Sequence, residues 1–153
     1  MKKSERAAQA RRELDRKLAA ANLDPISARP RGGWIRAVRT ALGMSQQVLA
    51  DRLHISGPSV VGLEKNEANE TISVGKLAEV ARALDCRLVY ALVPNTSFES
   101  TVQSQAERVA AQTLAYVDTT MGLEDQSVES QRHAERLATE ARRVIEANRQ
   151  WTR

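Results

Sequence analysis

The residues best placed for chemistry lie between positions 46 and 65, where polar side chains would stand at the starts of two helices. Gln46 would open the first helix, and a helix N-terminus with a side-chain amide is a good anchor for a phosphate group. The hydroxyls of Ser56 and Ser59 could each make a single hydrogen bond, and Val61 could touch an apolar group of a ligand. These side chains are suited to noncovalent contacts.

The sequence contains few residues that could support catalysis. Two histidines, His54 and His133, and one cysteine, Cys86, do not supply a plausible three-ligand metal set. The sequence contains neither a phosphate-binding glycine loop nor a nucleophile elbow. We therefore expect no enzymatic activity, no metal and no cofactor. His54 is better explained as a turn residue with positive φ, and Cys86 as a small apolar filler.

Apolar periodicity and helix caps predict a mainly α-helical chain. Ser45, Ser56 and Ser73 are placed as N-caps, Gly43 ends a helix, and residues 23–33 form a connector rich in proline and glycine. We expect helices at residues 4–21, 34–42, 46–53 and 57–65, from residue 73 onward, and at 97–123 and 127–150.

One segment, Arg87–Val93, changes period and is rich in β-branched and aromatic residues, which predicts a β-strand that ends at Pro94. Because a lone strand is unstable in water, it would need a partner from a second copy of the chain or from another protein.

The positive charge is concentrated near the N-terminus. The net charge is +4, and residues 1–40 hold eleven Lys or Arg against four Asp or Glu. Such a segment can meet nucleic acid, acidic protein or lipid, or can simply be a solvated helix. A single cysteine, the lack of an apolar leader and the lack of a long apolar run favour a cytoplasmic protein without a membrane segment.

The stretches Met44–Leu53 and Val60–Glu64 resemble the Xre family, the phage-repressor and Cro type of helix-turn-helix. This resemblance covers about Trp34 to Asp85 and implies a phosphate contact for Gln46. It also implies a partly buried structural ion pair between Arg39 and Glu64. The family's usual base-reading positions here hold no Arg, Asn or Gln, so we expect more weight on phosphates, DNA shape and basic residues.

The whole chain also resembles the bacterial family called mobile mystery protein A. The resemblance rests on Arg31–Arg36, the helix-turn-helix, Cys86–Pro94 and Thr120–Glu124. Members of that family are typically encoded beside a Fic-domain protein, which implies an antitoxin-like regulator of such a partner. The stretch from Thr120 to Asp125 is similar to the inhibitory motif of Fic antitoxins, but it ends in Asp where the motif has Gly or Asn. A plain helix C-terminus explains it equally well.

We therefore predict a five-helix Xre-type helix-turn-helix domain with an N-terminal helix, one short β-strand and a C-terminal helical pair. The expected regions are a basic helix and arm at 1–32, the DNA-binding domain at 33–85, a pairing strand at 86–94 and a helical region at 95–153. The predicted DNA-binding residues are Gln46, Gln47, Ser56, Gly57, Pro58, Ser59, Val61, Lys65, Arg29, Arg31 and Arg36. Arg29 and Arg31 would either enter a minor groove or belong to a solvated linker. Thr120 and Glu124 are candidates for toxin inhibition.

The expected function is that of a homodimeric, sequence-specific repressor that binds double-stranded DNA and regulates its own operon, with a possible Fic-domain toxin as protein partner. Two alternatives remain open at this point. One is an antitoxin that acts mainly by binding its protein partner, and the other is a phage-type repressor without a toxin.

Overall fold

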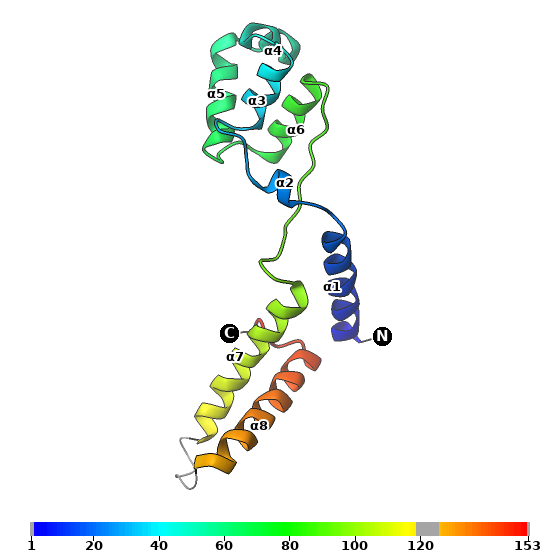
Figure 1. Ribbon diagram of the computed structural model, residues 1–153, viewed down its shortest axis with the longest axis vertical. Coiled ribbons are helices and arrows are strands. Elements are labelled where there is room, and N and C mark those ends of the chain that lie inside the picture. Colours follow the sequence, from blue (N-terminus) through cyan, green and yellow to red (C-terminus); the bar gives the residue numbers. More distant parts are fainter. Residues whose placement is uncertain (1, 119–125, 153) are drawn as a thin grey trace. The chain divides into compact units, whose positions relative to one another are not determined.

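The computed structural model describes residues 2–118 and 126–152, and this part of the chain is mainly helical (Figure 1). Its eight helices are α1 (Lys3–Ala19), α2 (Asp24–Ser27), α3 (Trp34–Ala41), α4 (Gln46–Leu53), α5 (Gly57–Ala68), α6 (Val74–Ala83), α7 (Phe98–Asp118) and α8 (Gln126–Glu146). Packing divides the chain into two units. One is Asn22–Ala91, called here the 22–91 unit, and the other joins Met1–Ala21 to Leu92–Arg153 and is called the terminal unit.

The core of the 22–91 unit is formed where α3, α4, α5 and α6 meet. Leu49, Ala50, Val60 and Val80 are completely buried there, and Ile35 is almost so. Burial of such aliphatic side chains stabilises a small domain by about 1.5–3 kcal/mol for each large one. The core thereby fixes the orientation of α5 relative to α4.

Two of the three predicted N-caps are confirmed in full. Ser45 Oγ accepts a hydrogen bond from the Val48 N–H at 3.2 Å, and Ser73 Oγ accepts one from the Lys76 N–H at 3.1 Å. Ser56 does occupy the N-cap position of α5, but its side chain makes no capping bond to the backbone. The connector before α3 contains one feature that was not predicted, the four-residue helix α2.

The terminal unit consists of α1, α7 and α8. Its core is a seam of small residues, in which Ala106 and Ala110 of α7 face Ala141 and Val144 of α8. Alanines allow two helix backbones to approach closely, so this seam packs α7 against α8 with little apolar surface.

The first helix is tied to the start of α7 by the polar contacts of two of its side chains. The Asp15 carboxylate accepts hydrogen bonds from the N–H groups of Phe98 (2.8 Å) and Glu99 (3.2 Å), and the Arg11 guanidinium pairs with the Glu99 carboxylate at 2.8 Å. Asp15 therefore acts as a cap for a helix 83 residues further along the chain.

The predicted β-strand at Arg87–Val93 is wrong, since the residues that the structure describes contain no strand. This segment has no regular secondary structure, and Val89, Tyr90 and Leu92 are 71%, 74% and 85% exposed. A strand forms only when a second strand accepts and donates its backbone hydrogen bonds. Among residues 2–118 and 126–152 no segment supplies them, so β-propensity alone does not produce a strand.

No helix among the described residues combines the length and the apolar character that a membrane span requires.

Candidate nucleic-acid interface

The helix pair α4–α5 is joined by a turn of three residues. His54 follows α4 with φ 55° and ψ 43°, a left-handed conformation, as was predicted for this position. The Ile55 N–H donates to the Ala50 carbonyl at 3.0 Å and so closes the end of α4. Because Ala50 has no bulk beyond Cβ and is fully buried, α5 can pass close to α4 at this turn.

The face of α5 that holds it in the domain is distinct from the face that it presents to solvent. Val60, Glu64 and Glu67 are buried, and their i, i+4, i+7 spacing places them on one side of the helix. On the outer side, Pro58, Ser59 and Lys65 are exposed and Val61 is 48% exposed. The N-terminal half of α5 is therefore free to meet a ligand without any change in the core.

The buried carboxylate of Glu64 links three helices. It receives the Arg39 Nε at 2.6 Å, and the two side chains are only 12% and 9% exposed. Arg39 Nη1 also donates to the Met44 carbonyl at 2.8 Å, and Gln46 Nε2 lies 3.4 Å from the second Glu64 oxygen. The predicted pair of Arg39 and Glu64 is thus in contact, and it joins α3 to α5 beside the start of α4.

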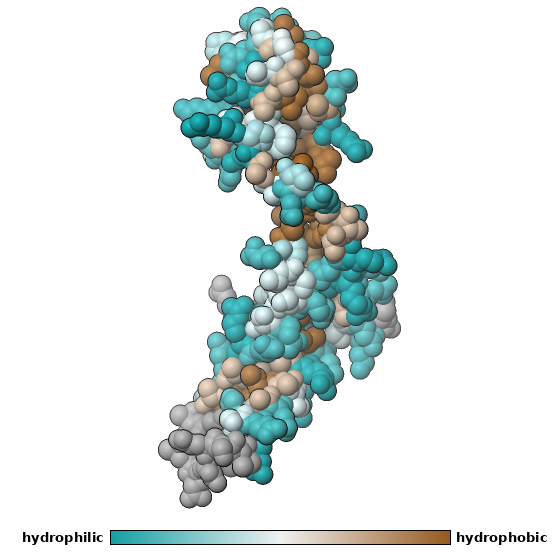
Figure 2. Space-filling view, viewed as in Figure 1, coloured by the Kyte–Doolittle hydropathy of each residue, from teal (hydrophilic) through white to brown (hydrophobic). Residues whose placement is uncertain are grey.

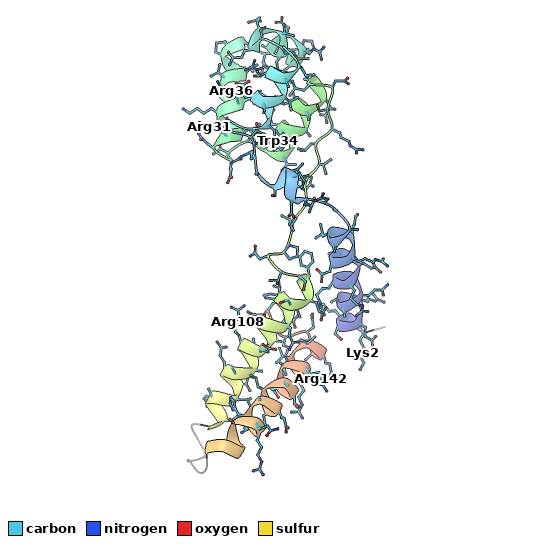
Figure 3. All side chains as sticks on the ribbon, in the orientation of Figure 1. Lys2, Arg31, Trp34, Arg36, Arg108 and Arg142 are labelled. Carbon is cyan, nitrogen blue, oxygen red and sulfur yellow. The ribbon has the colours of Figure 1, made fainter. Side chains whose placement is uncertain are left out.

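A groove of about 310 Å³ runs over this ion pair, between α3 and α5. Its lining includes Gly32, Gln46 and Val61, and the side chains of Arg36 and Lys65. Both cations are exposed, and neither forms an ion pair within the described residues. Figure 3 shows Arg31 and Arg36 on the side of the unit where α5 lies. The groove therefore has cationic walls next to the outer face of α5, as a phosphate site requires.

Another carboxylate, that of Glu67, fixes the start of α3. It accepts hydrogen bonds from the N–H groups of Trp34 (2.7 Å) and Ile35 (2.8 Å), and Glu67 is only 4% exposed. Gly33 has φ 91° and ψ 168°, a region that only glycine enters readily. A Cβ on Gly33 would stand 2.6 Å from Glu67 Oε2, so this position requires glycine for space as well.

Arg29 is held at the surface of the unit by two contacts with the end of α5 and the turn after it. Its Nη1 donates to the Glu67 carbonyl at 3.1 Å, and its Nη2 pairs with the Glu70 carboxylate at 2.9 Å. As a cation at the C-terminal end of α5 it meets the negative end of the helix dipole. Arg29 therefore ties the connector to the end of α5 although its side chain is still 37% exposed, and Arg31 is also exposed.

The remaining predicted residues lie at the first turn of α5 or nearby. The Ser56 and Ser59 hydroxyls are 2.7 Å apart and hydrogen-bonded to each other. Gln47 donates to the Asp51 carboxylate at 2.8 Å, and its Oε1 faces Gly57. The two candidates for toxin inhibition, Thr120 and Glu124, lie outside the described residues.

Sequence reasoning missed Glu67 and Asp15, the two carboxylates that cap distant helices. No pattern of neighbouring residues marks either of them, because the N–H groups that donate to their carboxylates are 32 to 84 residues away in the sequence. In the described part of the chain, no three His, Cys, Asp or Glu side chains are grouped so that they could hold a metal ion.

Residues 35–90 match the Helix-turn-helix family, of the Xre type. The match concerns the 22–91 unit and indicates a DNA-binding transcription regulator. No curated protein and no solved structure matches the chain.

Proposed function

We propose that this chain, which contains an Xre-type helix-turn-helix domain, is a repressor that binds a specific DNA site as a homodimer and controls its own operon. The observation that supports this most strongly is the exposed outer face of α5 beside the groove walled by Arg36 and Lys65. A helix of this kind can enter the major groove with its N-terminal residues first.

Phosphate contacts would position the domain on the duplex. Arg36 and Lys65 carry unpaired charge at the groove, and Gln46 is placed at the N-terminus of α4 where a phosphate is favoured. Base contacts would come from the hydroxyls of Ser56 and Ser59 and from the Val61 methyl groups. With so few base contacts, sequence-dependent DNA shape would contribute much of the specificity.

A homodimer would read two half-sites about 34 Å apart or a multiple of that distance. The segment Val89–Val93 is the proposed pairing element, because its apolar side chains are more than half exposed. Two copies that pack these side chains against each other would remove their apolar surface from water. Replacing Tyr90 and Leu92 by arginine should then give a monomer in sedimentation experiments with weaker DNA binding. An unchanged dimer would reject this element.

The protein partner that we propose is a Fic-domain toxin encoded beside this gene, and the only support for it is the sequence resemblance described above. Co-expression with the protein encoded by the neighbouring gene tests it directly. If Glu124 takes part in inhibition, Glu124→Gly should release the AMP transfer activity of that protein. Unchanged inhibition would remove Glu124 from the proposal.

The repressor function is tested with a duplex of the DNA upstream of the gene and a scrambled duplex of the same length. Specific binding should exceed nonspecific binding by about 10³-fold or more. Gln46→Ala should weaken binding to both duplexes, whereas Ser59→Ala should mainly reduce the discrimination between them. Equal affinity for the two duplexes, together with co-purification of the partner protein, would favour the alternative of an antitoxin that acts mainly by binding its partner.

A further inference from the structure

The outward face of α1 carries a second group of unpaired cations, in the terminal unit. The residues of α1 that are partly buried follow helical spacing and mark its inner face: Ser4, Ala7, Ala8, Arg11, Asp15 and Leu18. Arg11 and Asp15 of this set make the contacts to the start of α7. The inner face therefore packs against α7 and α8, and the opposite face remains in solvent.

Six cations lie outside that inner face, and all of them are exposed. They are Lys2, Lys3, Arg6, Arg12, Arg16 and Lys17. Within residues 2–118 and 126–152, none of them forms an ion pair with a carboxylate. We call these six residues the basic face of α1, and Figure 2 shows the corresponding surface as strongly hydrophilic.

Two exposed carboxylates, Glu5 and Glu13, lie near these six cations, so the face keeps a net charge of +4. Glu5 accepts a hydrogen bond from the Lys2 N–H at 2.7 Å and so caps the start of α1. Glu13 accepts one from the Gln9 amide at 2.9 Å. Lys17 lies fifteen positions after Lys2, so the face extends over about 22 Å at 1.5 Å per residue. That length can meet several phosphates of one duplex.

We propose that the basic face of α1 is a second DNA-binding surface, which contacts phosphates without reading bases. The inference rests on the proposed function, because it takes the polyanion to be the duplex that the helix-turn-helix binds. It adds a separate role for the terminal unit, which would contribute affinity and salt dependence but no sequence discrimination.

Charge and shape favour DNA over a lipid surface as the partner of this face. A helix that lies in a membrane interface needs large apolar side chains along the face opposite its cations. The apolar side chains of the inner face of α1 are alanines and Leu18, and this face is already packed against α7 and α8. Leu14 is the one large apolar side chain of α1 that is exposed, at 47%, and a single leucine is too little apolar surface for a membrane-bound helix.

The test compares the full chain with the triple variant Arg12→Gln/Arg16→Gln/Lys17→Gln. Affinity for the upstream duplex and for a scrambled duplex is measured from about 50 to about 300 mM salt, the range where phosphate contacts are most visible. The variant should bind both duplexes at least ~10-fold more weakly at low salt, and the slope of log affinity against log salt should be smaller in magnitude by about 2 to 3. The ratio of the two affinities should stay within about twofold of its original value.

The matched control is Arg108→Gln/Arg142→Gln/Arg149→Gln, which removes three exposed cations of the terminal unit that lie outside α1. It should leave the slope unchanged. An unchanged slope in the α1 variant, or an equal loss in the control, would overturn the inference. So would binding of the parent chain to vesicles of phosphatidylserine that exceeds its binding to DNA and is lost in the α1 variant. Failure of the proposed function has a different signature, namely equal affinity of the parent chain for the two duplexes.

Discussion

Replacing Gly33 by alanine should destabilise the 22–91 unit by about 4 kcal/mol, which is much of the stability of a small domain. Two costs contribute. Alanine at φ 91° and ψ 168° costs about 2 kcal/mol in backbone strain. The added Cβ, 2.6 Å from Glu67 Oε2, also displaces the carboxylate that receives the N–H groups of Trp34 and Ile35. Losing two buried, charge-assisted hydrogen bonds costs at least about 2 kcal/mol more.

A double-mutant cycle separates these two costs. In a chain that already carries Glu67→Ala, the steric conflict is gone, and Gly33→Ala should cost only the backbone strain of about 2 kcal/mol. Glu67→Ala alone should cost about 2–3 kcal/mol, because the first turn of α3 loses its acceptor. The coupling energy between positions 33 and 67 should therefore be about 2 kcal/mol.

Tryptophan fluorescence during urea unfolding can measure this cycle. The chain has two tryptophans, and Trp151→Phe leaves Trp34, which lies beside the site, as the reporter of the 22–91 unit. Trp151 is 60% exposed, so its replacement should cost little. The reasoning is refuted if Gly33→Ala costs the same with and without Glu67, or if it costs less than about 1 kcal/mol in the parent chain.

Three further predictions concern other buried contacts. Arg39→Met should destabilise the 22–91 unit by about 3 kcal/mol, and adding Glu64→Met should recover much of that loss; urea unfolding without such recovery would contradict it. Asp15→Ala should weaken the docking of α1 by about 1–2 kcal/mol, seen as faster amide exchange in α1, whereas unchanged protection would speak against the cap. Ala141→Leu should overfill the seam between α7 and α8 and lower the free energy of unfolding by about 1–3 kcal/mol; a stability equal to that of the parent in circular dichroism melts would show that the seam has room.

The sequence was informative wherever the determinants of structure lie a few residues apart. Ser45 and Ser73 cap helices through N–H groups three residues away, and His54 adopts the left-handed turn that its position demands. Such short-range interactions leave a recognisable pattern of residue types. The periodicity of apolar residues likewise predicts the helices, with ends that differ by a few residues.

The parts that could not be predicted depend on contacts between distant segments. Glu67 and Asp15 each cap a helix from another part of the chain, and an isolated glutamate or aspartate in the sequence gives no sign of this. The contacts of Arg29 with the Glu67 carbonyl and the Glu70 carboxylate, 38 and 41 residues away, likewise have no sign in the sequence. The strand predicted at Arg87–Val93 is absent for a different reason. Its composition favours a strand, but the described residues contain no second strand with which it could pair.

The separation of the two faces of α5 has a consequence for how this domain could acquire a new target. Val60, Glu64 and Glu67 anchor the helix from within, and the side-chain hydrogen bonds of the two glutamates go to Trp34, Ile35, Arg39 and Gln46. Under the proposed function, substitutions at the three outer positions Pro58, Ser59 and Val61 would alter which bases are read and leave the hydrogen bonds of Glu64 and Glu67 in place. A library randomised at only these positions should contain many folded members, and selection against new operators could draw on them to redirect the protein.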